Sequence, residues 1–229
     1  MTNRGEGPEG FRGVGAERKS SSQVHSNPAA AAFRPIGATP YLSPVPVVMV
    51  GCADPEAGFR PNLITVAWAG TCCSRPPMLS ISLRKERHSY ALIKRTGEFT
   101  VNLVSEKLLN AMDFCGVKSG RDIDKFEALG LTAIPAPALD FAPALAESPA
   151  FLCCKVRQIL PLGSHDLFLA EITQVCVGEE YFTETGAINE KRMALVCYVH
   201  GKYRSLADEI GFFGFSVAKE DVRRRRMGK

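Results

Sequence analysis

The sequence predicts a mainly β, antiparallel fold of the barrel or sandwich type. From Leu42 to Leu206, short runs of β-branched and apolar residues are separated by Gly, Pro, Asn and Asp at intervals typical of such folds. A chain of 229 residues with 45% hydrophobic content is long enough and apolar enough for one domain with a substantial core. We therefore expect one β-rich domain with few helices.

The expected strands follow one another along this region. Each is a run of apolar, β-branched or aromatic residues between turn-forming residues. In chain order they are residues 45–52, 63–69, 78–84, 99–103, 131–134, 151–160, 166–177 and 194–198.

Two helices are expected to interrupt these strands. The first covers residues 89–96, which a glycine follows, with basic residues in the last turn. The second covers residues 106–114, with Ser105 as its candidate N-cap. Asp122 is expected to cap a further short turn that ends at Gly130.

The two ends of the chain differ in composition from the domain, which we place at residues 38–207. Residues 1–37 show no helical or strand period and are expected to be a disordered extension or an over-long translation start. Residues 208–229 form a C-terminal segment with a basic tail, whose four consecutive arginines, residues 223–226, account for the formal net charge of +4. A solvated, disordered tail is favoured over a contact with nucleic acid or an anionic membrane.

Apolar runs and cysteine spacing exclude several classes of protein. The apolar residues 44–51 fall far short of the roughly 20 residues that a membrane-spanning helix needs. The first residues lack an apolar signal-peptide core, so a cytoplasmic protein is expected. The eight cysteines contain no C-x-x-C spacing and the four histidines do not cluster around them, so no metal site is expected. Most of these thiols are expected to pack in the core.

A strand that leads directly into a helix is the strongest candidate for a binding feature. Over residues 78–84 apolar and polar side chains alternate, with Ser82 and Arg84 on the polar face. The chain continues through Arg87 to the helix that begins at Ser89. A helix N-terminus offers unpaired N–H groups, so these residues favour an anion such as phosphate. A capped surface helix with solvated basic residues is the alternative.

Upstream of this strand, residues 62–68 are expected to form a strand that ends in a loop of small residues, 69–74, which includes Thr71. Small residues let the backbone approach a flat ligand, and backbone amides with a few hydroxyl groups can hold a flavin ring. Trp68 is either a contact of such a ring or an anchor of the core. With the anion-binding helix start, this segment indicates a phosphate-bearing cofactor, and we expect FMN.

Several longer motifs occur in order along the chain. They are N-L-I-T-V-A-W-A-G-T from Asn62, R-P-P-M-L-S-I-S-L-R-K-E-R-H-S-Y from Arg75, T-G-E-F-T-V-N-L from Thr96, C-G-V-K-S-G-R-D-I-D-K-F from Cys115 and G-S-H-D-L-F-L-A-E-I from Gly163. Together they resemble the flavin reductase-like, FMN-binding split-barrel family, and within it the flavoredoxin-type branch. The resemblance implies a six-stranded antiparallel split barrel of Greek-key type with a few flanking helices, a homodimer, and non-covalent FMN near the subunit interface.

Carried over by position, the resemblance assigns residues to the two parts of FMN. Those that would line the isoalloxazine ring are Thr65, Val66, Ala67 and Trp68, with Thr71 in the small-residue loop and Ser82, Leu83 and Arg84 continuing the wall. Those that would hold the ribityl phosphate are Arg87, His88 and Ser89. Arg121 and Lys125 are further candidates for cofactor or phosphate contact, although Asp122 and Asp124 would equally well form salt bridges with them.

His165 stands at the start of a strand, in a block where the resemblance implies a histidine near the open face of the flavin. An imidazole, which titrates near neutral pH, would orient a nicotinamide there or supply a proton to reduced flavin. A hydrogen-bonded histidine at a strand end is the alternative. The chain has no G-x-G-x-x-G motif, so NAD(P)H would bind transiently over the flavin.

The resemblance thus implies an FMN-dependent oxidoreductase, in which hydride passes from NAD(P)H to flavin N5. The electrons then go to another acceptor, such as a redox partner protein or a monooxygenase. A flavoredoxin-like electron carrier with tightly bound FMN and a protein partner is the second hypothesis. A ligand-binding module without redox turnover is the third.

Overall fold

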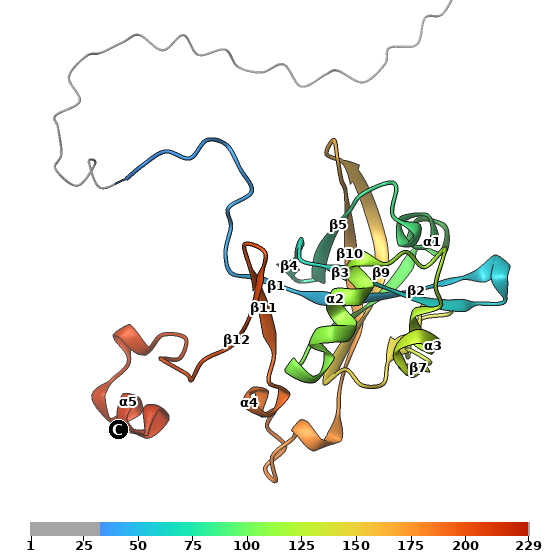
Figure 1. Cartoon of the computed structure of the whole chain (residues 1–229). Coiled ribbons are helices and arrows are strands. Elements are labelled where there is room, and N and C mark those ends of the chain that lie inside the picture. Colours follow the sequence, from blue (N-terminus) through green and yellow to red (C-terminus); the bar gives the residue numbers. More distant parts are fainter. Residues whose placement is uncertain (1–32, 229) are drawn as a thin grey trace, which may run out of the picture. The chain divides into compact units, whose positions relative to one another are not determined.

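The computed structural model describes residues 33–228 (Figure 1). The chain divides into two compact units, Met1–Pro40 and Tyr41–Lys229. In the first unit, residues 33–40 form neither helix nor strand. The rest of the predicted disordered extension, residues 1–32, lies outside the described residues.

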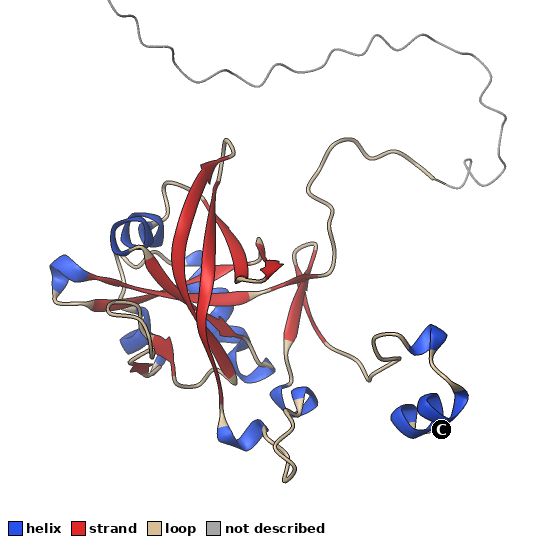
Figure 2. Cartoon of the chain, turned by 180° about the vertical axis from the view of Figure 1, so that it is seen from behind, coloured by secondary structure: helices blue, strands red, loops and turns tan. Residues whose placement is uncertain are grey.

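The main sheet of the second unit has seven strands in the order β3-β2-β6-β9-β10-β5-β4, each antiparallel to its neighbours. The strands are β2 Val48–Asp54, β3 Arg60–Val66, β4 Ala69–Ser74, β5 Pro77–Leu83, β6 Glu98–Leu103, β9 Ala150–Pro161 and β10 Asp166–Val177. The long hairpin of β9 and β10 is prominent in Figure 2. The mainly β, antiparallel prediction is confirmed, with one strand more in this sheet than the six expected.

Two small sheets, five α-helices and four 3-10 helices complete this unit within the described residues. β1 Val45–Pro46, β11 Val196–Val199 and β12 Lys202–Ser205 form one small sheet, and β7 Ala133–Ile134 pairs with β8 Ala144–Leu145. The helices are α1 His88–Thr96, α2 Leu109–Val117, α3 Lys125–Leu129, α4 Glu190–Met193 and α5 Glu220–Met227. No helix within residues 33–228 is long and apolar enough to cross a bilayer.

β2 is buried on both faces and separates two hydrophobic clusters. Val50 belongs to the first cluster, together with Ile93 of α1. Met49 belongs to the second, together with Met112 of α2 and Phe126 of α3. Because successive side chains of a strand point to opposite faces, α1 covers one face of this part of the sheet, and α2 and α3 cover the other.

Polar side chains on one face of β6 fasten the segment that follows β7. The buried carboxylate of Glu98 accepts hydrogen bonds from the backbone N–H groups of residues 140–142. Thr100 donates to, and Asn102 accepts from, the backbone of residues 143–145. The alternating polar residues of the T-G-E-F-T-V-N-L motif therefore have a structural role in closing this loop.

Two segments have more regular structure than the sequence predicted. Residues 69–74, expected as a loop, form the edge strand β4. The basic C-terminal run, expected to be a disordered tail, is part of α5. In α5, Glu220 pairs with Arg223 and Arg224 three and four residues later, which stabilises an exposed helix.

The helix starts and the cysteines also depart in part from expectation. Ser105 precedes a 3-10 turn, Glu106–Leu108, but its side chain makes no capping bond. α3 is capped by Asp124, not by Asp122, because Asp124 Oδ1 accepts the N–H groups of Phe126 and Glu127. Four of the eight thiols are buried, half and not most as predicted: Cys52, Cys115, Cys153 and Cys154. Cys72 is exposed, and the other three are half-buried.

Candidate functional site

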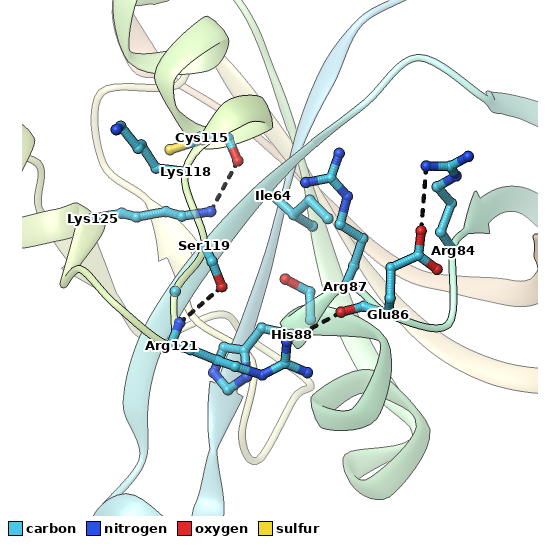
Figure 3. A pocket seen from close by; sticks show the side chains of 12 residues that line it. Ile64, Arg84, Glu86, Arg87, His88, Cys115, Lys118, Ser119, Arg121 and Lys125 are labelled. Atoms are coloured by element: carbon cyan, nitrogen blue, oxygen red, sulfur yellow. Dashed lines mark hydrogen bonds and ion pairs between the residues drawn. The ribbon is translucent and has the colours of Figure 1, made fainter.

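A pocket lies where β5 ends and α1 begins (Figure 3). Its walls come from β3, the turn between β5 and α1, the end of α2, the loop after α2 and the start of α3. The lining residues are Ile64, Arg84, Glu86, Arg87, His88, Ser89, Cys115, Lys118, Ser119, Gly120, Arg121 and Lys125. The structure therefore gathers the predicted phosphate-binding residues with both further candidates, Arg121 and Lys125.

The start of α1 is not capped by a side chain. Arg87 occupies the N-cap position with an extended backbone, and its side chain makes no capping bond. In the first turn, Tyr90 N donates to Arg87 O at 3.0 Å, whereas the N–H groups of His88 and Ser89 have no acceptor within the helix. Ser89 is buried, and its Oγ accepts a hydrogen bond from Asn62 Nδ2 at 2.8 Å. The Ser89 hydroxyl thus fastens α1 to β3, next to open backbone donors.

Lys125 brings a buried ammonium to the pocket. Its exposed fraction is 3%, and Nζ donates to Leu63 O at 2.6 Å and to Cys115 O at 2.9 Å. Burial lowers the pKa of Lys125, because the charged form loses hydration. The alternative expectation of a salt bridge with Asp124 is wrong, since Asp124 pairs with Arg60 at 3.5 Å. An ammonium has three donors, so one remains beyond these two neutral carbonyls.

The loop after α2 approaches α1 and β3 closely at a glycine. A Cβ at Gly120 would lie 2.1 Å from Asn62 Oδ1 and 3.1 Å from His88 Cδ2, so a larger residue would clash. Next to it, Arg121 Nη1 donates to Glu86 O at 3.2 Å, which joins this loop to the turn before α1. Arg121 therefore bonds to a backbone carbonyl in the pocket wall and not to the aspartates that follow it.

The pocket has an excess of positive charge. Its cationic residues are Arg84, Arg87, Lys118, Arg121 and Lys125. Glu86 is the one carboxylate among its lining residues, and its Oε1 lies 3.3 Å from Arg84 Nη1. Burial is the main cause that lowers the pKa of His88 below its ordinary value of 6.5, and the positive charge of Arg121 is the second cause. The arrangement suits an anion with several oxygens, such as a phosphate monoester.

The residues expected beside the flavin ring lie mainly at the ends of β3 and β5. Val66 and Leu83 point into the core, so only their backbone is available to a ligand. The Thr65 hydroxyl donates to a carbonyl of α2. Ser82 N donates to Trp68 O at 2.9 Å, which joins the two segments expected to form the ring-binding wall.

The exposed ring candidates are Trp68, Thr71 and Arg84, whereas Ala67 is half-buried. The Trp68 side chain is 41% exposed and tilts against Tyr198, with ring centroids 6.3 Å apart, so the core-anchor alternative is wrong. Thr71 is exposed on the edge strand β4. Apart from Arg84, the ring candidates do not line the pocket, so the structure brings together the predicted phosphate contacts and leaves the ring candidates outside it.

His165 lies in the turn between β9 and β10, at the end of the sheet where β5 stops and Arg84 follows. Its neighbour Asp166 pairs with Leu83 across the sheet. The partly exposed His165 has Nδ1 at 2.9 Å from Ser164 Oγ. It is not among the lining residues of the pocket, and its role beside a flavin stays a prediction.

Residues 41–207 match the model of the flavin reductase like domain. The chain belongs to the flavin reductase-like family. It is similar to flavoredoxin of Desulfovibrio vulgaris (Miyazaki F), with 31% identity, a TM-score of 0.74, and coverage of 82% of this chain and 100% of that chain. It has the same fold as an FMN-binding protein from Thermus thermophilus, with 23% identity, a TM-score of 0.65, and coverage of 79% of this chain and 98% of that chain.

A relative by sequence is the reductase component of 4-nitrophenol 4-monooxygenase/4-nitrocatechol 2-monooxygenase from Rhodococcus opacus. It is 26% identical over 114 residues, which are 50% of this chain and 57% of that protein. The family and the split-barrel class predicted from the motifs are thereby confirmed. The family is one of flavin-binding proteins.

Some of the lining residues were not predicted. They are Ile64, Glu86, Cys115, Lys118, Ser119 and Gly120. Three of them, Lys118, Ser119 and Gly120, belong to the motif C-G-V-K-S-G-R-D-I-D-K-F. The motif indicated that this segment matters, but it did not show that the segment packs against the start of α1. Glu86 is one charge within a run of basic residues, and nothing in that local pattern shows that it faces the pocket.

Proposed function

We propose that this chain is an oxidoreductase that binds FMN non-covalently and receives hydride from NADH or NADPH. The observation that carries the proposal is the cationic pocket at the uncapped start of α1. A phosphate at a helix N-terminus is stabilised by open N–H groups and by the helix dipole. Such a pocket favours a phosphorylated flavin over riboflavin.

In this proposal each part of FMN has its own set of residues. The phosphate is held by Arg87, Arg121, Lys125 and the first turn of α1 at His88 and Ser89. The ring lies along Thr65, Val66, Ala67, Trp68, Thr71, Ser82 and Leu83, with Arg84 between the two parts. The buried ammonium of Lys125 supports this division, because its two protein acceptors are neutral and an anion would supply its counter-charge.

When bound, the flavin supplies the redox chemistry as a hydride acceptor. The residues of this chain bind the phosphate, orient the ring and restrict the directions from which a donor can approach. We assign His165 to the approach of the nicotinamide, where an imidazole would hold a hydrogen bond or a proton. Its position near the end of β5, which Arg84 follows directly, supports this assignment.

The function is tested by an absorption spectrum followed by an anaerobic titration. Purified protein supplied with FMN should show the visible flavin bands, and NADH or NADPH should bleach them. Absence of bleaching with both donors would refute hydride transfer from a nicotinamide nucleotide. A protein that binds no added FMN would refute the flavin site itself.

A second candidate function is an electron carrier with tightly bound FMN and a protein redox partner. The similarity to flavoredoxin, at 31% identity over 82% of this chain, favours it. In that case dithionite would bleach the bound flavin while neither nicotinamide nucleotide would. The relation to the Rhodococcus opacus reductase component favours the first function, with a monooxygenase as acceptor.

We also propose that the chain forms a homodimer with FMN near the interface. The exposed Trp68 and the exposed edge strand β4 support the dimer. In a single chain they leave uncovered the surface on which we expect the flavin ring to lie. Light scattering of the purified protein should give twice the mass of one chain. The mass of a single chain would contradict the dimer.

A further inference from the structure

Glu86 places a negative charge in a pocket that is otherwise cationic. It is the one carboxylate among the lining residues, and its Oε1 lies 3.3 Å from Arg84 Nη1 (Figure 3). A site that attracts an anion therefore contains a carboxylate that already occupies one of its guanidinium groups. The sequence alone gave no reason to expect this pairing.

A phosphate monoester has to compete with this carboxylate. It carries about −1.5 to −2 charges at pH 7, so it is repelled by a glutamate in the same pocket. The planar guanidinium of Arg84 bonds best to one anion at a time, in a two-donor arrangement. Phosphate binding therefore either displaces Glu86 from Arg84 or accepts repulsion from it, and both lower the affinity.

We propose that Glu86 is an affinity-determining residue, an internal counterion of Arg84 that keeps FMN in exchange with solution. This inference rests on the proposed function, because it concerns how the pocket treats the flavin phosphate. An FMN that exchanges with solution can be reduced on this protein, dissociate and then serve an acceptor protein as a substrate. A permanently bound flavin would serve instead as a fixed carrier.

The backbone around Glu86 is held without help from its side chain. Arg87 N donates to Arg84 O at 3.1 Å, which closes the turn before α1. Arg121 Nη1 donates to Glu86 O at 3.2 Å, which fixes the turn to the loop after α2. The substitution Glu86→Gln keeps the shape of the side chain and both backbone bonds, so it changes the charge alone.

Glu56 provides a matched control. Its Oε2 pairs with Arg95 Nη1 at 2.8 Å, and neither residue lines the pocket. The substitution Glu56→Gln therefore removes the same charge from a similar exposed ion pair outside the flavin site. It also alters the net charge of the protein by the same amount as Glu86→Gln.

The test titrates FMN and riboflavin in parallel into the full-length wild type, Glu86→Gln and Glu56→Gln, by quenching of flavin fluorescence. At low ionic strength we expect Glu86→Gln to bind FMN about three- to tenfold more tightly than the wild type, as removal of one partly solvated charge near a dianion implies. FMN release should slow, and the difference should shrink at high salt. Riboflavin affinity should be equal in all three proteins.

Three results would overturn the inference. Unchanged or weaker FMN binding by Glu86→Gln, in a wild type that prefers FMN to riboflavin, removes the counterion role and leaves the proposed function intact. Equal tightening of FMN and riboflavin also removes it, because the effect would not involve the phosphate. A wild type that binds neither flavin overturns the inference and the proposed function together.

Discussion

Replacing Lys125 by methionine is expected to weaken FMN binding by about tenfold to a hundredfold. The substitution keeps the apolar stem and removes an ammonium that is 3% exposed and donates to Leu63 O at 2.6 Å and Cys115 O at 2.9 Å. A hydrogen bond to a charged group contributes about 1.5–3 kcal/mol, and about 1.4 kcal/mol is a factor of ten in affinity. Loss of one such bond to the phosphate gives the expected range.

The same substitution has two opposing effects on folding. The carbonyls of Leu63 and Cys115 lose a donor, at a cost of up to about 1–3 kcal/mol for each one left unsatisfied. Removal of the buried charge recovers the desolvation cost that lowers the pKa of Lys125. We therefore expect a net destabilisation of only about 1–2 kcal/mol and a folded variant.

The assay compares FMN and riboflavin affinities by fluorescence titration. Lys85→Met is the matched control, because Lys85 pairs with Asp166 at 3.4 Å and does not line the pocket. FMN affinity should fall in Lys125→Met alone, with riboflavin affinity unchanged. Equal losses for the two flavins would show that Lys125 supports the shape of the site and not the phosphate. Unchanged FMN affinity would refute the phosphate contact outright.

The remaining predictions concern the surroundings of the pocket. Gly120→Ala should lower the free energy of unfolding by about 1–3 kcal/mol and weaken FMN binding, because the new Cβ would lie 2.1 Å from Asn62 Oδ1. Urea denaturation measures the first effect, and a denaturation midpoint equal to that of the wild type would contradict this packing. In His88 the folded-state pKa is lowered, so the unfolded chain takes up the proton first and stability is lost as the pH falls below 6.5 toward the lowered value. His88→Gln should therefore flatten that acid slope, and an unchanged slope would show that His88 does not cause it. Glu98→Gln should lower the free energy of unfolding by about 3 kcal/mol, because the Glu98 carboxylate accepts hydrogen bonds from the N–H groups of residues 140–142. Thermal unfolding measures this loss, and a loss below about 1 kcal/mol would contradict the structural role of the carboxylate.

The junction of β5 and α1 was predictable because its signals are local. The alternation over residues 78–84 shows which side chains share a face of the strand. The helix start that follows it brings Arg84, Arg87 and Ser89 within a few residues of open N–H groups. These effects act over one or two turns, so a single sequence contains them.

The closure of the pocket was not predictable, because it depends on residues far apart in the chain. Lys125 bonds to the carbonyl of Leu63, 62 residues away. Gly120 packs on Asn62, and its backbone needs no unusual torsion that would mark it in the sequence. The residue types were visible, but their proximity arises only when α2 and α3 cover the second hydrophobic cluster.

The errors at β4 and α5 have different physical causes. β4 consists of small residues such as Gly70 and Thr71, which favour a loop locally, and it is a strand because it pairs with β5. α5 was interpreted as disordered because of its charge, yet Glu220 lies one turn from the arginines it pairs with. The guanidinium of Arg226 also lies over the Phe212 ring, 5.0 Å from its centroid.

The relative affinity of the wild type for FMN and riboflavin tests most directly whether the pocket at the start of α1 holds a phosphate. The two flavins differ only in that group. With several charge-assisted bonds to the phosphate, FMN should bind at least about a hundredfold more tightly than riboflavin at low ionic strength. Equal affinities would contradict the phosphate site.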